Sequence, residues 1–248
     1  MIELKNIYKS FGNFVVLEDL NLKINTGESL VIIGRSGCGK SVLLKHIIGL
    51  MRPDTGSVMI DDTDITKISS KELDQVRMDF GMLFQGAALF DSLTVLQNVG
   101  FRLFEYTDLA EEEVKQRVTE YLAMVGLKGI EGTKPAQLSG GMKKRVGLAR
   151  AISMSPKIIL FDEPTTGVDP IMGDIINDLI RYLHDTLKTT SITVTHDMKS
   201  AYKIADRIAM LYDKHIIAVG TPEEIENSDN SIVRQFVTGS AEGPITSK

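Results

Sequence analysis

Short runs of apolar and β-branched residues, without alternating polar positions, recur along the chain. Residues 31–33 read Val-Ile-Ile, and residues 158–161 read Ile-Ile-Leu-Phe. Such runs are typical of parallel strands that are buried on both faces. Residues 191–195 and 208–212 predict two further strands. The pattern therefore indicates an α/β protein with a largely parallel sheet.

Helical periodicity appears between residues 108 and 126. Its apolar positions fall on one face, Asp108 stands where a cap is expected, and Gly126 stands where the helix should stop. Residues 86–156 as a whole favour helix, so we expect a helical insertion between two strands of the sheet. Residues 1–28 alternate short strands with turn residues, which predicts an antiparallel β flap.

The C-terminal part of the chain carries little pattern. From Asp229 onward the periodicity is lost. We therefore expect one α/β domain over residues 1–225, and a tail over residues 226–248 that is mobile or contacts a partner or a second copy.

Composition and charge restrict the possible functions. Of the 248 residues, 43% are hydrophobic and 25% are charged, which is typical of a globular protein with a large core. The formal net charge of −5 disfavours nucleic acid as a partner. The apolar runs are far shorter than the roughly 20 residues that cross a bilayer, so membrane association would need a partner. A single cysteine and a start without signal-peptide character favour the cytosol.

The strongest motif fits the phosphate loop pattern G-x-x-x-x-G-K-[ST] and stands between a predicted strand and a helix expected over residues 42–50. Glycines let the backbone N–H groups converge on phosphates, Lys40 reaches the β- and γ-phosphates, and Ser41 ligates Mg²⁺. Cys38 occupies a variable position and is either a small filler or a regulatory thiol. The candidate nucleotide-binding residues here are Gly34, Arg35, Ser36, Gly37, Cys38, Gly39, Lys40, Ser41 and Val42.

Two carboxylates, Asp162 and Glu163, follow the predicted strand 158–161. The carboxyl ends of parallel strands are where ligands bind in open α/β sheets. Asp162 is expected to ligate Mg²⁺. Glu163 is expected to polarise the water that attacks the γ-phosphate. The two motifs together indicate a P-loop NTPase.

Residues 138–142 read Leu-Ser-Gly-Gly-Met, and this segment resembles the signature of ATP-binding cassette ATPases. The resemblance implies that Ser139, Gly140 and Gly141 bind the ATP held by a second copy, so that two nucleotides are sandwiched in a head-to-tail homodimer. Met142 departs from the usual glutamine. The implied fold has an ABC-type mixed parallel core sheet, the N-terminal flap, and the helical subdomain inserted before the signature.

Four further residues match landmarks of this family. Gln85 matches the glutamine that senses Mg²⁺ and water, and His196 matches the histidine that bonds the γ-phosphate. Asp169 matches the residue that contacts the phosphate loop of the second copy, and Phe11 matches the aromatic that stacks on adenine. The other histidines are expected to be core or surface residues.

Cassette ATPases of three classes come into question: transporter subunits, soluble assembly ATPases, and DNA-repair or translation ATPases. The chain has a single cassette and no heptad repeat, which disfavours a DNA-repair or translation ATPase. A soluble assembly ATPase, of the iron–sulfur cluster type, has the same size and stays an alternative, as does an importer ATPase for another substrate. Residues 82–99, Met142 and residues 233–244 resemble the Mla/Mkl-type cassettes, which serve phospholipid transporters with MCE-domain partners.

That resemblance implies a peripheral protein on the cytoplasmic side of the inner membrane. Its implied partners are a second copy, a separate permease, an MCE-domain protein and a small regulatory subunit. The expected docking surface for a permease helix follows Gln85 and includes Leu89, Phe90, Leu93 and Val95.

Overall fold

The computed structural model describes residues 1–246; Ser247 and Lys248, the end of the expected tail, lie outside the described residues. The chain folds into two compact units. The first contains residues 1–73 and the chain from Ile192 onward, and the second contains residues 74–191. Every helix within the described residues is too short or too polar to cross a bilayer.

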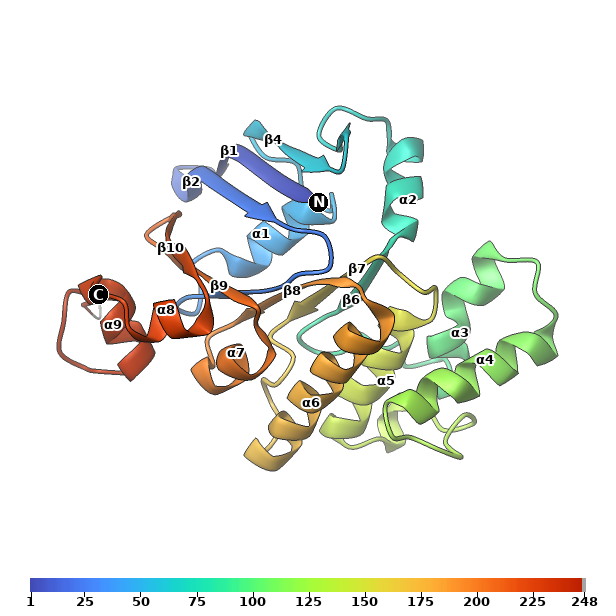
Figure 1. Ribbon diagram of the computed structural model, residues 1–248. Helices are drawn as coiled ribbons and strands as arrows, with labels where there is room; N and C mark the ends of the chain where they lie inside the picture. The colour runs from blue at the N-terminus through green and yellow to red at the C-terminus, as the bar shows by residue number, and fades with distance from the viewer. Residues whose placement is uncertain (247–248) are drawn as a thin grey trace. The chain divides into compact units, whose positions relative to one another are not determined.

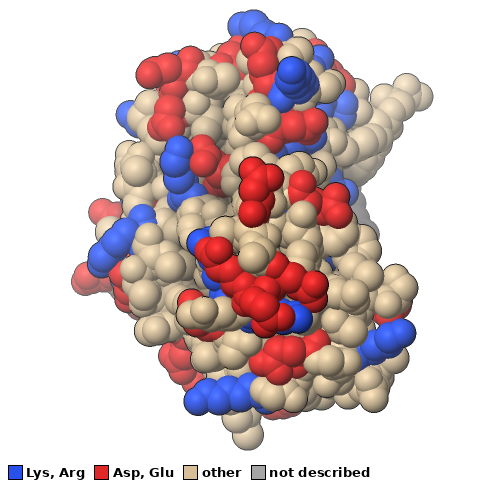
Figure 2. Space-filling view, turned by 90° about the vertical axis from the view of Figure 1, so that its right-hand side faces the viewer, with Lys and Arg blue, Asp and Glu red and all other residues tan. Residues whose placement is uncertain are grey.

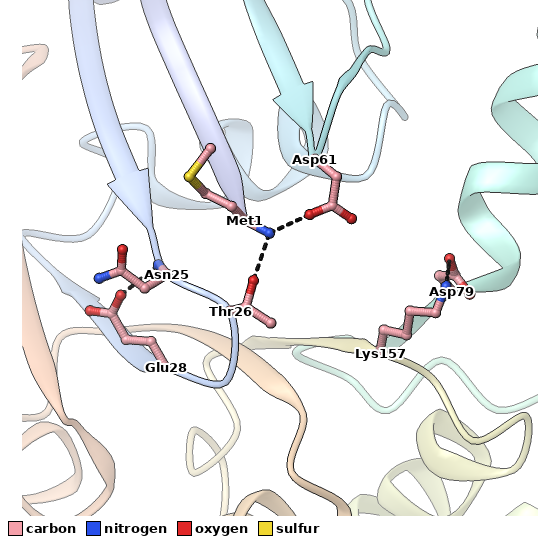
Figure 3. A network of polar contacts seen from close by, with 7 residues as sticks. All are labelled: Met1, Asn25, Thr26, Glu28, Asp61, Asp79 and Lys157. Carbon is pink, nitrogen blue, oxygen red and sulfur yellow. Dashed lines mark hydrogen bonds and ion pairs between the residues drawn. The ribbon is translucent and has the colours of Figure 1, made fainter.

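The first unit begins with the predicted antiparallel flap (Figure 1). Its strand order is β2-β1-β4-β5, and Phe11 pairs with Phe14 across the turn at Gly12. The backbone nitrogen of Met1 donates to Thr26 Oγ1 over 2.8 Å and contacts Asp61, which fixes the start of β1 (Figure 3). The strands are β1 (Ile2–Phe11), β2 (Phe14–Ile24), β4 (Thr55–Ile60) and β5 (Thr63–Asp64).

A second sheet supplies the buried strands of the first unit. Its order there is β10-β9-β3-β8; β3 pairs with β9 in parallel, and β9 pairs with β10 as an antiparallel hairpin. Every residue of β3 is buried, as its uninterrupted apolar run predicts. These strands are β3 (Ser29–Ile33), β8 (Thr190–Thr195), β9 (Arg207–Tyr212) and β10 (His215–Gly220), and the helices are α1 (Lys40–Ile47), α7 (Met198–Ile204), α8 (Pro222–Glu226) and α9 (Ser231–Thr238).

Residues 230–246 are ordered although their periodicity is weak. Asn230 caps α9, accepting at Oδ1 from the backbone N–H of Ile232 over 2.9 Å. Val233 is fully buried. A helix of only eight residues gives a short pattern, and its cap is the better indicator.

A buried amide holds the segment after α9. Gln235 donates from Nε2 to the carbonyl oxygens of Ser240 and Ile245, over 3.2 and 3.1 Å, and accepts at Oε1 from Ile245 N–H over 2.6 Å. Thr246 then accepts at its carbonyl oxygen from Arg35 over 3.1 Å. The tail thus folds back onto its own unit and reaches the loop after β3.

The second unit contains two parallel strands and a group of α-helices. Phe80 pairs with Ile158 and Leu83 pairs with Phe161. At the start of this pair Lys157 bridges to Asp79 over 2.9 Å (Figure 3). Helices α3, α4 and α5 pack on one another and form the expected helical insertion (Figure 1). Its elements are β6 (Phe80–Leu83), α3 (Val95–Tyr106), α4 (Glu111–Met124), η1 (Pro135–Gln137), α5 (Gly140–Ile152), β7 (Ile158–Asp162) and α6 (Pro170–Leu187), while α2 (Ser70–Met78) crosses the division of the two units.

The prediction that Asp108 caps α4 is wrong. The helix begins at Glu111, and its N-cap position is Ala110, which makes no side-chain cap, instead of Asp108. Three consecutive glutamates in the first turn, residues 111–113, interact with the helix dipole instead of a cap. The predicted stop at Gly126 is confirmed by its φ of +70°. Figure 2 faces the helical part of the chain and shows acidic side chains gathered over the middle of this face.

Candidate active site

The phosphate loop lies between β3 and the first residue of α1, within the first unit. A Cβ added at Gly34 would collide with the carbonyl oxygen of Leu211, and one at Gly39 would lie 2.8 Å from Val16 Cγ1. Gly39 has a φ of +108° and forms the N-cap of α1. Larger residues therefore cannot stand at these two positions, and the loop curls directly into a helix N-terminus, where anions bind.

Lys40 is buried beneath this loop. Its Nζ donates to the carbonyl oxygens of Gly34 and Arg35, over 2.8 and 3.0 Å. The ammonium is thus held inside the curl of the loop. Ser41 and Val42 are half-buried in the first turn of α1, Cys38 is half-buried, and Arg35, Ser36 and Gly37 are exposed.

Phe11 and His196 also belong to the first unit. Phe11 ends β1 with 47% of its surface exposed, and Lys9 Nζ lies 5.6 Å from the centre of its ring. His196 is exposed and directly follows β8. The next residue, Asp197, caps α7 by accepting from Lys199 N–H over 3.0 Å, which fixes the backbone beside the histidine.

The predicted carboxylates belong to the second unit. Asp162 is the last residue of β7, and Glu163 follows it; both are buried. Glu163 has a φ of +47°, in the left-handed region that non-glycine residues rarely adopt. The Thr166 hydroxyl donates to Glu163 Oε2 over 3.2 Å. The carboxylate therefore stands on a tightly turned backbone, a kind of conformation that clusters at functional sites.

The signature segment opens α5. Ser139 is the N-cap, and its Oγ accepts from Met142 N–H over 3.2 Å. Asp169 caps α6 in the same way, accepting at Oδ1 from Met172 N–H over 3.0 Å. A Cβ at Gly141 would lie 2.6 Å from Met172 Cγ, so the first turns of α5 and α6 are in close contact. Ser139, Gly140 and Asp169 are exposed at these helix ends.

Gln85 is exposed in the segment that follows β6. Its successors Ala87 and Ala88 have φ angles of +61° and +47°, both in the left-handed region. Burial lowers the pKa of nearby Lys144 on α5, while the charges of Asp162 and Glu163 act to raise it. This lysine is not identified by any motif.

Asn98 is a second residue that the sequence pattern does not identify. It is fully buried on α3 and holds the loop that precedes this helix. Its Oδ1 accepts from Phe90 N–H over 2.8 Å, and its Nδ2 donates to carbonyl oxygens of Phe90, Leu93 and Thr94 over 3.0 to 3.2 Å. A polar residue inside an apolar helix face is the only indication that the sequence offers.

The histidines without a predicted role are placed as expected. His46 and His184 are buried, and His215 is exposed. Burial lowers the pKa of His46.

The expected Mg²⁺ donors are chemically suitable. Ser41, Gln85 and Asp162 offer hydroxyl, amide and carboxylate oxygens, which are the hard ligands that Mg²⁺ takes together with phosphate oxygens. Within residues 1–246, no group of three or more His, Cys, Asp or Glu residues could hold a metal by itself.

The chain is similar to several known proteins. The family model described as "ABC transporter" matches residues 17–166. The probable ribonucleotide transport ATP-binding protein mkl of Mycobacterium tuberculosis H37Rv is 45% identical over 98% of this chain and 68% of its own length. The intermembrane phospholipid transport system ATP-binding protein MlaF of Haemophilus influenzae is 42% identical over 100% of this chain and 94% of its own length.

Solved structures agree with these relatives. The dimeric, post-hydrolysis ATP-binding cassette MJ0796, bound to ADP and Pi, matches with a TM-score of 0.83 and 36% identity over 90% of this chain and 99% of that chain. The chain belongs to the ABC transporter family and is one of its ATP-binding, ATP-hydrolysing subunits. Within the family it is similar to the Mkl and MlaF proteins, as residues 82–99 predict.

Proposed function

We propose that this chain hydrolyses ATP on the cytoplasmic face of a membrane to power the movement of glycerophospholipid through a separate permease. The observation that carries the proposal is the length-matched similarity to MlaF, which extends over 94% of that protein. The mkl proteins, named for ribonucleotide transport, are longer, and this chain spans 68–70% of them. A third relative, 42% identical, bears the name of a glycerolipid: TRIGALACTOSYLDIACYLGLYCEROL 3 of Arabidopsis thaliana.

The residues of the first unit are proposed to hold the nucleotide. The loop amides and Lys40 bind the phosphates, because convergent N–H groups and an ammonium complement their charge. Phe11 stacks on adenine, and His196 bonds the γ-phosphate. Ser41 would ligate Mg²⁺ together with Gln85 and Asp162, and the metal would neutralise charge that develops on the phosphates.

The residues of the second unit are proposed to perform hydrolysis and to complete the site of a second copy. Glu163 accepts the proton of the attacking water, and Gln85 helps to orient that water. Ser139, Gly140 and Gly141, at the start of α5, bind the nucleotide of the second copy, and Asp169 contacts its phosphate loop. Hydrolysis should therefore depend on protein concentration.

Two substitutions separate binding from hydrolysis. Lys40→Ala should lose affinity for a fluorescent ATP analogue. Glu163→Gln keeps the side-chain shape but loses basicity, so it should bind ATP normally and turn over about 10²- to 10⁴-fold more slowly. His196→Ala should bind ATP and hydrolyse it slowly. Normal nucleotide affinity of Lys40→Ala, or normal turnover of Glu163→Gln, would refute the corresponding assignment.

The proposed permease-docking surface lies on the loop before α3 and on α3 itself. Phe90 is 47% exposed and contacts Phe101, with ring centres 5.0 Å apart and ring planes tilted by 38°. Phe101, Phe104 and Tyr106 are exposed on α3. Val95 was expected to contribute to this surface, but it is fully buried in the packing of α3 and cannot contact a partner.

Introduction of a charge tests this surface. Phe90→Asp should fold and bind ATP but no longer copurify with the permease from membranes, and lipid transport should stop. Phe14→Asp is the matched control, because Phe14 is more exposed, at 69%, and lies in the flap hairpin. Equal copurification of the two variants would contradict the docking proposal.

The lipid assignment is tested by deleting the gene and by reading the neighbouring reading frames. A multi-spanning permease beside an MCE-domain protein and a small regulatory subunit is the expected set of partners. A loss of iron–sulfur enzyme activities with normal envelope lipids would instead favour the soluble assembly ATPase. The iron import protein FbpC of Escherichia coli O157:H7, 38% identical over 63% of its length, represents the importers for another substrate.

A further inference from the structure

Helix α5 contacts the segment after β6 through buried positive charge. The side chain of Lys144 lies on α5 with 5% of its surface exposed. Its Nζ donates to the carbonyl oxygen of Gln85 over 2.5 Å and to that of Glu163 over 3.2 Å. One ammonium group therefore joins the backbones of two residues that come from different strand ends.

A second cation on the same helix holds the residues that follow Gln85. Arg150 donates from Nη1 to the carbonyl oxygen of Ala88 over 2.7 Å and from Nη2 to that of Ala87 over 2.6 Å. Both alanines are in left-handed backbone conformations. We call residues 85–88 the Q-segment. Its carbonyl groups point at α5 at three of its four positions.

The helix and the Q-segment are in direct contact between these two cations. Gly147 lies between Lys144 and Arg150, and a Cβ there would be 2.6 Å from Leu83 Cδ1 and 3.3 Å from Ala87 Cβ. The absence of a side chain at Gly147 lets the helix approach closely enough for both cations to reach the backbone. Hydrogen bonds from a charged donor are stronger than neutral ones, so this packing is well fixed.

We propose that Lys144 is a positioning residue for ATP hydrolysis, whose ammonium group holds Gln85 and Glu163 in one fixed relation. The inference rests on the proposed roles of these two residues in the hydrolytic site. Lys144 acts through their backbones and contacts no reacting atom. Glu163 needs such support because its own backbone is left-handed, and in-line attack tolerates little displacement of the base.

This arrangement has a consequence for control of hydrolysis. Ser139, the proposed contact to the nucleotide of a second copy, is the N-cap of the helix that carries Lys144. A helix is rigid over so short a distance, so a shift of Ser139 also shifts the ammonium and, through it, Gln85 and Glu163 of the same copy. The signature of one subunit is thereby connected to the hydrolytic residues of that same subunit.

The experiment compares variants of the full chain by kcat, by KM and by affinity for a fluorescent ATP analogue. Lys144→Met should lower kcat about tenfold to 100-fold and leave KM and nucleotide affinity nearly unchanged, because only the alignment is lost. Lys144→Arg, which keeps the charge and the donors, should recover most of the turnover. Lys143→Met is the matched control, because Lys143 is the half-exposed neighbour on the same helix, and its kcat should stay within about twofold of wild type.

The proposal is overturned if folded Lys144→Met has an unchanged kcat. It is also overturned if Lys144→Met has a lower kcat and Lys144→Arg does not restore it. The proposal is also overturned if kcat/KM falls only because KM or the nucleotide dissociation constant rises. If Lys144→Met does not fold, as judged by thermal unfolding, Lys144→Gln replaces it, and wild-type kcat in that variant overturns the proposal. Glu163→Gln is run alongside: full turnover there refutes the site assignment itself, whatever Lys144 does.

Discussion

The guanidinium of Arg102 donates from Nη1 to the carbonyl oxygen of Phe80 over 2.8 Å, which ties α3 to the first residue of β6. Its Nη2 also reaches the carbonyl oxygens of Arg77 and Met78, each over 3.3 Å. Burial lowers the pKa of Arg102 from its ordinary value. The helix with the exposed aromatic residues is thus joined to the strand that leads to Gln85.

Arg102→Met should destabilise the protein by about 1–3 kcal/mol, because it leaves carbonyl groups without their donor. Urea unfolding measures the loss. Arg117→Met serves as control: Arg117 pairs with Glu113 over 2.8 Å at the surface, with both side chains over 40% exposed, so its loss should stay below about 1 kcal/mol. Similar losses for the two variants would show that the Arg102 contacts add nothing to folding.

The flap should lose stability in acid through Asp54. Hydrogen bonds from Lys9, then from the backbone and hydroxyl of Ser10, lower the pKa of Asp54 to about 2. A carboxyl whose pKa is depressed in the folded protein contributes stability above its ordinary pKa, and this contribution is lost as the pH falls toward 2.

Asp54→Asn should therefore show a smaller drop in urea midpoint between pH 6 and pH 2.5 than wild type. Lys9→Met should show the same flattening, since it removes the main cause of the shift. A drop as large as that of wild type in both variants would mean that the acid sensitivity lies elsewhere.

Cys38 is half-buried in the phosphate loop and gives a chemical test of that loop. A bulky maleimide should block ATP binding, and bound Mg·ATP should protect the thiol from the reagent. Cys38→Ser should bind ATP normally and be insensitive to the maleimide. Mass spectrometry measures the extent of labelling, and a nucleotide-binding assay measures its effect. Full ATP binding by labelled protein would place the thiol away from the nucleotide.

Gln235 should control the order of the tail. Gln235→Leu removes three hydrogen bonds to Ser240 and Ile245, so amide hydrogen exchange of residues 240–246 should speed up markedly. Gln116→Leu is the control, because Gln116 lies exposed on α4 and bonds to neighbouring Glu120. Unchanged exchange in the Gln235 variant would show that other contacts hold the tail.

The strands and the phosphate loop could be predicted because each depends on a local pattern. A buried parallel strand needs an uninterrupted apolar run, and residues 31–33 and 158–161 show it. The cap of α4 could not be predicted in the same way, since three glutamates stabilise that helix start without a capping side chain. A residue with good cap chemistry, Asp108, stood too early in the chain.

Lys144, Asn98 and Arg102 escape prediction for a different reason. Each is a polar side chain whose partners are backbone carbonyl groups of loops or strand ends. A carbonyl group has no sequence identity, so no motif records the contact. The signature resemblance placed the start of α5 correctly but gave no role to the lysine one turn further on.

The exposure of Phe11 allows a fluorescent reporter to be introduced at this position. The chain contains no tryptophan, so Phe11→Trp would make residue 11 its single strong emitter. Nearly half of the side chain at this position faces solvent at the end of β1. If adenine stacks at residue 11 as proposed, an indole there would report the arrival and departure of the base as a change in fluorescence, in real time and without a labelled nucleotide.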